Sequence, residues 1–212
     1  MSTLHECKDD IDISIIVPVY NLEAFLDPLL DSLKNQELGD YTAQILFVLN
    51  NCTDRSEDVI RRSGIDCTIL NCKTQGCGPA RNAGMDVATG EYIWFMDGDD
   101  WLLSNTAVKD ALDKARAEDL NVLRIPFKSN GFYYMYFSMV WQYLLRRDFV
   151  NEFRFPDYQP AEDDAFMSGV LNKYGTDRYN FIGLPSMERP QYFYNYMREG
   201  SNMFRFHKGD VI

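Results

Sequence analysis

Short apolar runs alternate with segments of helical periodicity along the first 130 residues of the chain. The runs are rich in β-branched residues and apolar on both faces, which is typical of strands buried in a parallel sheet. Such strands are predicted over Asp12–Tyr20, Gln44–Asn50, Cys67–Leu70, Tyr92–Met96 and Asn121–Phe127.

The segments between these runs predict helices. From Leu22 to Leu33, leucines and Phe25 recur at helical spacing, and Pro28 is expected to kink or shorten the first turns. Strands that alternate with helices predict an α/β fold with a mostly parallel sheet flanked by helices. The other helices are predicted from Thr53 or Asp54 to about Arg62, over Gly78–Gly90, and from Ser104 to near Glu118.

Beyond Gly131 the sequence changes character. The aromatic-rich stretch Phe132–Tyr143 predicts an amphipathic helix that faces the core. The alternative is that its rings line a groove for a sugar acceptor or touch a membrane, in which case Arg146 and Arg147 would meet a pyrophosphate. A Pro- and Asp-rich link follows, and a further helix is predicted to open with the acidic trio at residues 162–164.

Composition narrows the functional classes. The chain has 212 residues, of which 46% are hydrophobic, and this indicates a folded domain with a sizeable core. Its formal net charge of -11 argues against a nucleic-acid-binding protein, because such proteins neutralise phosphates with Lys and Arg. A negatively charged substrate would need positive charge supplied locally, by a few arginines or by a metal ion.

The sequence contains no apolar segment long enough to span a bilayer, and its first residues, MSTLHECKDD, lack the core of a signal peptide. The five cysteines show no CxxC spacing, so we expect reduced thiols in a cytosolic protein and no zinc site. The only histidines are His5 and His207, near the two ends of the chain. Acid–base chemistry is therefore expected to come mainly from carboxylates.

Asp97, Asp99 and Asp100 follow the strand predicted at Tyr92–Met96 directly. Because open parallel sheets bind ligands at the carboxyl ends of their strands, VYNLE, NNCTD and MDGDD are expected at one edge. Asp97 and Asp99 would project to the same side, and Gly98 allows a ligand to approach the backbone. Such oxygen ligands suit Mg²⁺ or Mn²⁺ with substrate phosphates completing the coordination. The alternative is a solvated acidic loop that caps the next helix.

The second acidic cluster lies in AEDDAF, Ala161 to Phe166. Carboxylates in the first turn of a helix interact favourably with the helix dipole. Taken alone, this cluster therefore indicates helix capping more readily than catalysis.

These motifs, in this order, resemble family 2 glycosyltransferases, which are nucleotide-sugar-dependent enzymes with the GT-A fold. The resemblance is strong from about Ile13 to Trp101 and moderate from Trp141 to about Phe204. It implies a single GT-A domain over residues 1–212, with an N-terminal extension (1–12), a nucleotide-sugar-binding half (13–127) and an acceptor-binding half (128–212). The motifs that carry it are IIVPVYNLEAFLDPLLDSL, TDRS, GPARNAGMDVATGEYIWFMDGDDWL, WQYLLRRDF, EDDAF and YNYMREGSNMF.

Site residues follow from the resemblance. Asp97 and Asp99 match the DxD motif, with Asp99 as the direct metal ligand and Asp97 nearer the ribose. Asp163 matches the Asp of the ED motif, the general base of these inverting enzymes. Arg81 also suits a phosphate electrostatically. Six residues match segments around the nucleobase and ribose or along the nucleotide pocket: Pro18, Tyr20, Glu23, Gly78, Arg81 and Asn82.

One position departs from the family. A VDDGSTD-like stretch is common after the second strand, and here it reads VLNNCTD. Asn50 stands where a carboxylate usually accepts the ring N–H of uracil. An amide oxygen can accept that bond without charge, and the amide nitrogen could instead face an acceptor. The motifs therefore imply a nucleotide-sugar more directly than they imply UDP.

The resemblance implies a metal-assisted inverting hexosyltransferase in the cytoplasm, with or without peripheral membrane contact. It would move a sugar from a nucleotide-sugar, with a UDP-sugar expected, to a hydroxyl of a glycan or lipid-linked acceptor. Two other classes stay open. A nucleotidyltransferase would usually carry a Gly/Arg/Lys-rich phosphate loop after the first strand, whereas VYNLEAF has no Lys or Arg. A non-catalytic nucleotide-sugar-binding module is kept open by the altered LNN stretch.

Overall fold

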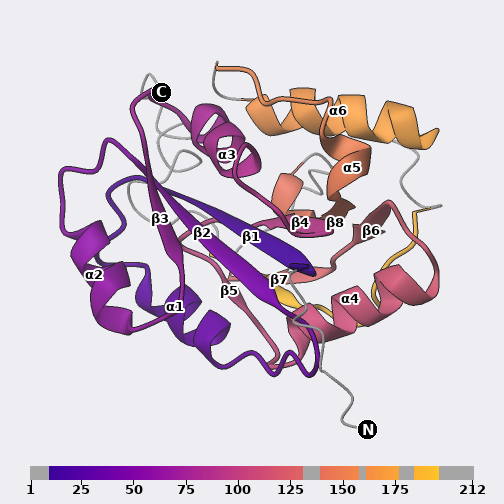
Figure 1. Cartoon of the computed structure of the whole chain (residues 1–212), viewed down its shortest axis with the longest axis horizontal. Helices are drawn as coiled ribbons and strands as arrows, with labels where there is room; N and C mark the ends of the chain where they lie inside the picture. The colour runs from indigo at the N-terminus through magenta and orange to yellow at the C-terminus, as the bar shows by residue number, and fades with distance from the viewer. Residues whose placement is uncertain (1–9, 131–138, 158–160, 177–183, 196–212) are drawn as a thin grey trace, which may run out of the picture.

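The computed structural model describes residues 10–130, 139–157, 161–176 and 184–195. Its centre is a six-stranded sheet with strand order β3–β2–β1–β4–β8–β6 (Figure 1). The strands of this sheet are β1 (Ile13–Val19), β2 (Ala43–Asn50), β3 (Thr68–Cys72), β4 (Tyr92–Phe95), β6 (Val122–Arg124) and β8 (Tyr143–Arg146).

The sheet is mostly parallel, as predicted. β1 pairs in parallel with β2 and β4, and β2 pairs in parallel with β3, whereas β8 is antiparallel to both β4 and β6. Ile13 lies opposite both Ala43 and Tyr92, so the three strands start at the same level. The carboxyl ends of β1 to β4 therefore share one edge of the sheet, which is where ligands of such folds bind.

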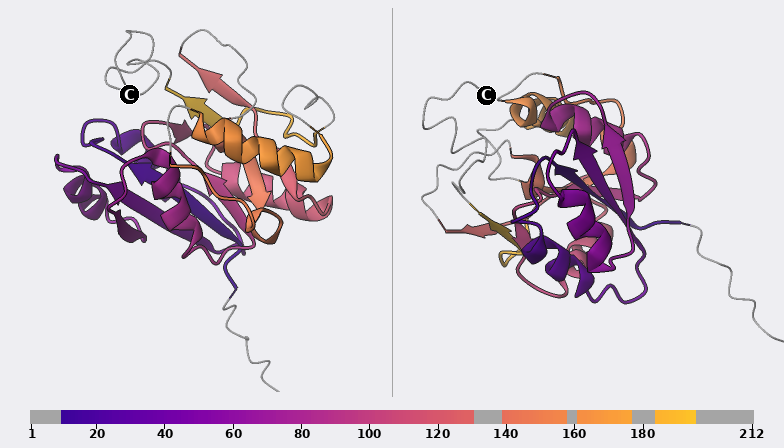
Figure 2. Two further views of the ribbon diagram at one scale, coloured as in Figure 1. Left: turned by 90° about the horizontal axis from the view of Figure 1, so that it is seen from above. Right: turned by 90° about the vertical axis from the view of Figure 1, so that its left-hand side faces the viewer.

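Helices cover both faces of this sheet. In Figure 1, α3, α5 and α6 lie above it and α1, α2 and α4 lie below it. The two further views agree with this layering and show α3 and α6 side by side (Figure 2). The helices are α1 (Asp27–Lys34), α2 (Ser56–Ser63), α3 (Cys77–Met85), α4 (Ala107–Ala117), α5 (Arg147–Val150) and α6 (Glu162–Tyr174).

Alternate side chains of β1 pack into two different hydrophobic cores. Ile15 packs in the core that contains Leu29 of α1, and Ile16 packs in the core that contains Ala80 of α3 and Met167 of α6. All seven residues of β1 are buried, because side chains alternate across a strand and both faces are covered. This explains why the sequence of β1 is apolar except for Ser14.

Pro28 shortens the first helix, as predicted. α1 begins at Asp27 with Pro28 in its first turn, and the residues from Leu22 to Leu26 form turns rather than helix. Proline is tolerated in a first turn because the N–H it lacks would have no partner within the helix there.

The prediction of one strand over Asn121–Phe127 was wrong. β6 ends at Arg124, and the chain then enters a separate three-stranded sheet of order β5–β9–β7. Pro126 lies between the two sheets and has no N–H to donate to a ladder. The strands of the second sheet are β5 (Trp101–Leu102), β7 (Phe127–Ser129) and β9 (Tyr192–Tyr194).

The helix predicted over Phe132–Tyr143 is also wrong where it can be compared. Residues 132–138 lie outside the described residues, but Val140–Gln142 form a single 3-10 turn, η1, and Tyr143 starts β8. Tyr143, Leu144 and Leu145 are buried because β8 fills the space between β4 and β6 and pairs with both. Tertiary pairing overrides the local pattern here.

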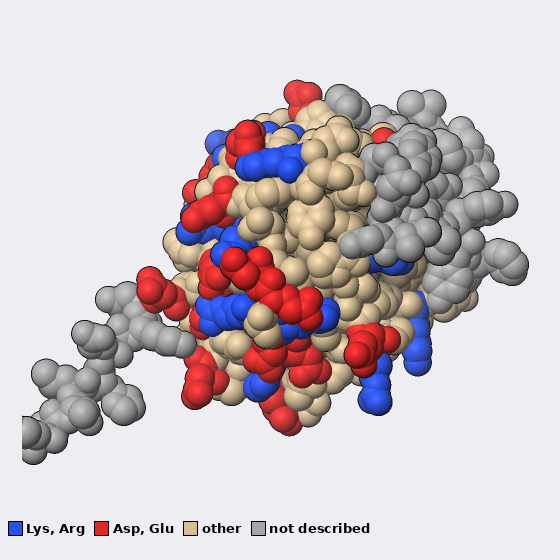
Figure 3. Space-filling view, turned by 90° about the vertical axis from the view of Figure 1, so that its right-hand side faces the viewer, with Lys and Arg blue, Asp and Glu red and all other residues tan. Residues whose placement is uncertain are grey.

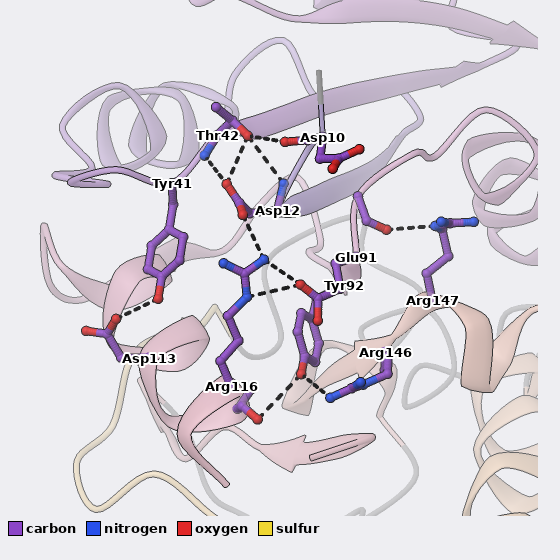
Figure 4. A network of polar contacts seen from close by, with 12 residues as sticks. Asp10, Asp12, Tyr41, Thr42, Glu91, Tyr92, Asp113, Arg116, Arg146 and Arg147 are labelled. Carbon is purple, nitrogen blue, oxygen red and sulfur yellow. Dashed lines mark hydrogen bonds and ion pairs between the residues drawn. The ribbon is translucent and has the colours of Figure 1, made fainter. Parts of the chain in front are cut away.

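Ion pairs clamp the amino-terminal edge of the sheet (Figure 4). Arg116 of α4 donates to Asp12, 2.7 Å away, and also to Glu91, while Asp12 accepts the backbone N–H of Thr42 at 2.6 Å. Asp12, Thr42 and Glu91 directly precede β1, β2 and β4. Burial tends to raise the pKa of Asp12, but the Thr42 and Arg116 hydrogen bonds outweigh it and lower that pKa.

The face viewed in Figure 3 shows acidic and basic side chains next to one another rather than in separate regions. Among the described residues, no helix combines the length and the apolar composition that crossing a bilayer requires. Among the described residues, Cys52, Cys67, Cys72 and Cys77 are free thiols.

Candidate functional site

The segments after β1 and β2 interlock at the carboxyl edge of the sheet. The side chain of Asn21, which has a left-handed backbone (φ 51°), accepts the N–H of Thr53 at 2.8 Å. Glu23 donates its N–H to Asp54 Oδ2 at 2.9 Å, and its own carboxylate accepts the N–H of Arg55 at 2.7 Å. The predicted site residue Glu23 is therefore held in place by the Asp54 side chain and the Arg55 backbone of the next segment.

The DGD segment packs directly on the segment after β1. A Cβ at Gly98 would lie 2.6 Å from Cδ1 of Leu22, so a larger residue here would require the Leu22 side chain to shift. Pro18 is buried in β1, whereas Tyr20, two residues on, is 44% exposed. VYNLE, NNCTD and MDGDD thus meet at one edge, as the sequence predicted.

Asn50, at the end of β2, is buried and bonded to the loop between β3 and α3. Its Nδ2 donates to the carbonyls of Thr74 (2.6 Å) and Cys72 (3.3 Å), and its Oδ1 accepts the N–H of Gly76 at 2.8 Å. Asn51 is exposed and donates from Nδ2 to the Lys73 carbonyl at 3.1 Å. The predicted contact of Asn50 with a nucleobase stays a prediction, and the structure adds that its amide already has partners within the chain.

Arg81 of α3 lies at the centre of the carboxylates. Its side chain is 3% exposed and donates to Asp97 Oδ1 at 2.9 Å, to Glu162 Oε1 at 3.1 Å and to Asp163 Oδ1 at 2.5 Å. One guanidinium therefore joins the DxD segment after β4 to the ED segment at the start of α6. A guanidinium suits this position because its donors point in several directions from one rigid plane.

Burial and charge act in opposite directions on this cluster. Burial raises the pKa of Asp163, the Arg81 guanidinium lowers it, and the neighbouring carboxylates of Glu162 and Asp97 raise it again, to about 7. Burial tends to lower the pKa of Arg81, but Asp163 and Asp97 raise it well above its ordinary value, so Arg81 stays charged. Asp163 is thus a carboxyl group that can gain and lose a proton near neutral pH.

The first turn of α6 uses its carboxylates outside its own helix. Asp163 Oδ2 accepts the N–H of Val140 at 3.2 Å, while Oδ1 faces Arg81. The N-cap residue, Ala161, makes no side-chain capping bond. Glu162 and Asp163 therefore lie in the first turn of α6, where acidic side chains interact favourably with the helix dipole, and they also pair with Arg81.

Gly78 and Asn82 pack against the chain that leads to α6. Asn82 donates to the carbonyl of Phe155 at 2.7 Å and accepts the Phe155 N–H at 2.9 Å. A Cβ at Gly78 would lie 2.3 Å from the Pro156 carbonyl oxygen. Both residues thus bring α3 and the chain before α6 together, and their predicted nucleotide contact stays a prediction.

Asp100 holds the DxD segment in place through Tyr192. It is fully buried, and it accepts the Tyr192 hydroxyl and the Asn195 N–H, each at 2.7 Å. The same Tyr192 oxygen accepts the N–H of Asp97 at 3.0 Å. Burial, followed by the charges of Asp99 and Asp97, raises the pKa of Asp100 well above its ordinary value. Sequence reasoning missed Tyr192, because nothing in QYFYNY distinguishes this tyrosine from its neighbours.

A metal ion at this edge would need oxygens from a substrate. Among the residues that the structure describes, no three His, Cys, Asp or Glu side chains group so as to hold a metal by themselves. Asp97 is half-buried with one oxygen on Arg81, and Asp99 is half-buried beside it. Two carboxylates fit Mg²⁺ or Mn²⁺ only if phosphate oxygens complete the shell, which is how such ions usually bind nucleotides.

Known proteins resemble this chain in sequence. The glycosyltransferase EpsJ of Bacillus subtilis is 34% identical over 119 residues, which are 54% of this chain and 33% of EpsJ. The poly(ribitol-phosphate) β-N-acetylglucosaminyltransferase TarS of Staphylococcus aureus is 27% identical over 219 aligned positions, 90% of this chain and 36% of TarS. The chain thus spans about a third of the length of either relative.

Solved structures share the fold. TarS residues 1–349 in complex with UDP-GlcNAc match with a TM-score of 0.78 and 23% identity, over 92% of this chain and 61% of that one. The mannosyltransferase PcManGT of Pyrobaculum calidifontis, in complex with GDP-Man and Mn²⁺, matches with a TM-score of 0.68 and 16% identity, over 94% and 61%. The predicted GT-A fold is therefore confirmed.

The sequence pattern of a single family covers most of the chain. It is that of glycosyl transferase family 2, and it matches residues 14–177, from β1 past the end of α6. The match includes all of the segments that converge on Arg81. The chain therefore belongs to glycosyl transferase family 2.

Proposed function

We propose that this chain is the catalytic domain of an inverting glycosyltransferase. It moves a sugar from a nucleoside-diphosphate sugar, with UDP as the favoured nucleotide, to a hydroxyl of a glycan or lipid-linked acceptor. The observation that carries the proposal is the Arg81 cluster, because one buried guanidinium holds a DxD carboxylate and an ED carboxylate together at the ligand-binding edge. The donor diphosphate and the acceptor hydroxyl would meet at this point.

Asp163 acts as the general base. A carboxyl group with a pKa raised to about 7 takes a proton more readily than an ordinary aspartate and is still ionised in half of the molecules at that pH. Its hydrogen bonds to Arg81 and Val140 fix its orientation. Direct displacement at the anomeric carbon needs no enzyme nucleophile, in keeping with the absence of histidine between His5 and His207.

Asp99, with Asp97 beside it, would hold Mg²⁺ or Mn²⁺ through the donor diphosphate. When bound, such an ion supplies charge stabilisation to the departing nucleoside diphosphate. Asp100 and Tyr192 orient the backbone that presents these carboxylates. The presence of Mn²⁺ with GDP-Man in the PcManGT structure supports this assignment.

The nucleoside would lie against the segments after β1 and β2. Tyr20 offers an exposed ring at the end of β1, and Glu23 is fixed next to it through Asp54 and Arg55. UDP-GlcNAc in the TarS structure supports a uridine nucleotide, and the poly(ribitol-phosphate) named for TarS supports a polyol or glycan acceptor. Action in the cytoplasm, peripheral to the membrane where the acceptor is lipid-linked, belongs to the same proposal.

The test is a binding and turnover screen with UDP-, GDP- and dTDP-sugars in the presence of Mn²⁺, read by thermal shift and by released nucleoside diphosphate. Asp99→Asn is expected to abolish the Mn²⁺-dependent part of nucleotide binding. Asp66→Asn, the same change at an exposed position before β3, is the matched control and should bind like wild type. If no donor shifts the melting temperature and none is hydrolysed, the donor assignment is wrong.

A further inference from the structure

We propose that Asn50 is a positioning residue, and that its amide holds the loop Cys72–Gly76 instead of reading the nucleobase. The hydrogen bonds that carry this inference lie within the chain and do not depend on a ligand. Its consequence for nucleotide recognition rests on the function proposed above. The inference also explains why an amide occupies a position where the family commonly has a carboxylate.

The hydrogen bonds of Asn50 leave its amide with little to offer a ligand. Both Nδ2 hydrogens are directed to loop carbonyls, those of Thr74 and Cys72, and Oδ1 accepts the N–H of Gly76. The residue is only 3% exposed. An amide has two donor hydrogens and one acceptor oxygen, so both donors and one of the two lone pairs of Oδ1 are used.

A carboxylate could not hold the same loop path. Aspartate at position 50 could accept the Gly76 N–H, but its second oxygen would face the Thr74 carbonyl at 2.6 Å and the Cys72 carbonyl at 3.3 Å. Oxygens without a hydrogen between them repel, and a buried charge left without a donor costs further free energy. The loop would have to move away from β2.

The loop also sets the start of α3. Gly76, whose φ is 127°, is the N-cap of that helix, and Arg81 lies one turn further on. Asn50 therefore fixes the loop Cys72–Gly76 at the ligand-binding edge of the sheet. It also fixes the start of α3, the helix that carries Arg81. A side chain in this position affects nucleotide affinity through the loop and not through one edge of the base.

The variant Asn50→Asp distinguishes a residue that positions the loop from one that reads the nucleobase. The probes are UDP and CDP in the presence of Mn²⁺. The uracil ring of UDP carries an N–H that the cytosine ring of CDP lacks, while the ribose and diphosphate are the same. We expect Asn50→Asp to weaken the binding of UDP and of CDP by a similar factor, about tenfold or more. The reason is that the loop loses a hydrogen bond whichever nucleotide is bound. A residue that reads the ring N–H would instead bind UDP more tightly once charged, and raise the preference for UDP over CDP.

A second measurement reports on the loop without any nucleotide. Lys73 is exposed within the loop, and the rate of tryptic cleavage after it can be followed by mass spectrometry. Asn50→Asp and Asn50→Ala are both expected to cleave faster than wild type. Asn151→Asp is the matched control, since it makes the same change on an exposed side chain that follows α5, and it should stay near wild type.

Each of these measurements can contradict the inference that Asn50 positions the loop. Tighter UDP binding by Asn50→Asp, or unchanged cleavage after Lys73 in both Asn50 variants, overturns the inference. If Asn50→Asp does not fold, Asn50→Ala carries the same expectations. If wild-type protein binds no nucleotide, the proposed function fails, while the cleavage rates still test the role of Asn50.

Discussion

Arg81 Nη1 lies 2.5 Å from Asp163 Oδ1, although the two residues are 82 positions apart in the chain. The other terminal nitrogen of the same guanidinium lies 2.9 Å from Asp97 Oδ1. One cation is thus shared between the carboxylate assigned to the donor side and the carboxylate assigned as base. The charge state and the position of Asp163 therefore depend on Arg81, which also contacts the DxD segment.

Arg81→Lys is expected to lower turnover while leaving the protein folded. Lysine keeps the positive charge, but a single ammonium cannot reach Asp97, Glu162 and Asp163 with the geometry of a planar fork. The base would lose its orientation, and kcat should fall by about tenfold or more, which corresponds to about 1.4 kcal/mol in the barrier. The measurement is the rate of nucleoside diphosphate release from the donor found in the screen.

The matched control is Arg61→Lys, because Arg61 forms an exposed ion pair with Glu57 on α2. It should leave both kcat and the melting temperature near wild type. Arg81→Ala should behave differently from both lysine variants, since it leaves buried carboxylates without their counter-charge and costs stability by about 3–5 kcal/mol. Wild-type kcat in Arg81→Lys would show that the shared cation has no role in the reaction.

The rate should rise with pH through about 7 and then level off. Asp163 must be deprotonated to accept the hydroxyl proton, and burial raises its pKa to about 7 against the pull of Arg81. Initial rates at saturating donor between about pH 5.5 and 8.5 test this. Asp163→Asn should bind the nucleotide and lose turnover at every pH, and a rate that is flat across this range in wild type would remove Asp163 from the base role.

The same carboxyl group links stability to pH. Its folded pKa lies above the unfolded value of about 3.9, so the folded state binds the proton more tightly. Its contribution to stability is fully present below about pH 4 and is lost as pH rises through about 7. Asp163→Asn should remove this part of the pH dependence in urea unfolding.

The sequence predicted the sheet and the order of the site segments because both depend on local patterns. Apolar runs such as Ile13–Val19 are buried on both faces, and the position of DGD after β4 follows from the chain order. The ends of elements were predicted less well: Pro28 correctly indicated a shortened α1, but β6 ends before Pro126, where one strand was predicted to continue to Phe127. Those boundaries depend on tertiary pairing and backbone chemistry that periodicity does not report.

The contacts that organise the site lie beyond what patterns can predict. Arg81 was expected to face a phosphate, and in the structure its donors lie on carboxylates from two distant segments. Asn82 was expected along the nucleotide pocket, and its amide holds the backbone of Phe155. In each case the residue type was informative, but its partner comes from a part of the chain that only the fold brings near.

Tyr192→Phe is expected to weaken the support of the DxD segment. The buried hydroxyl donates to Asp100 and accepts the N–H of Asp97, so its removal leaves a buried carboxyl group and a backbone N–H with fewer partners. The free energy of unfolding should fall by about 1–3 kcal/mol. Mn²⁺-dependent UDP binding should also weaken, because the Asp97 backbone is no longer fixed.

The control for this change is Tyr41→Phe, which removes a hydroxyl bonded to Asp113 near the surface and away from the carboxyl edge. Its effect on unfolding should be smaller, and its UDP affinity should equal that of wild type. Urea unfolding and calorimetric titration with UDP and Mn²⁺ distinguish the two variants. Equal behaviour of both would mean that Tyr192 serves packing alone.

Asp12→Asn is expected to destabilise the fold at neutral pH without changing the site. Asp12 is buried at the amino-terminal edge of the sheet and accepts hydrogen bonds from Arg116 and Thr42, which lower its pKa below the ordinary value (Figure 4). A lowered folded pKa gives stability that is present above the unfolded pKa of about 3.9 and is lost as pH falls through the folded pKa. The free energy of unfolding of the variant should therefore fall by about 1–3 kcal/mol at pH 7 and by less at acid pH, where wild type also loses the charge.

Urea unfolding at both pH values measures this loss of stability, and an equal loss at each pH would contradict the charge-based account. UDP affinity should stay at the wild-type value, because this clamp and the Arg81 cluster lie at opposite edges of one sheet.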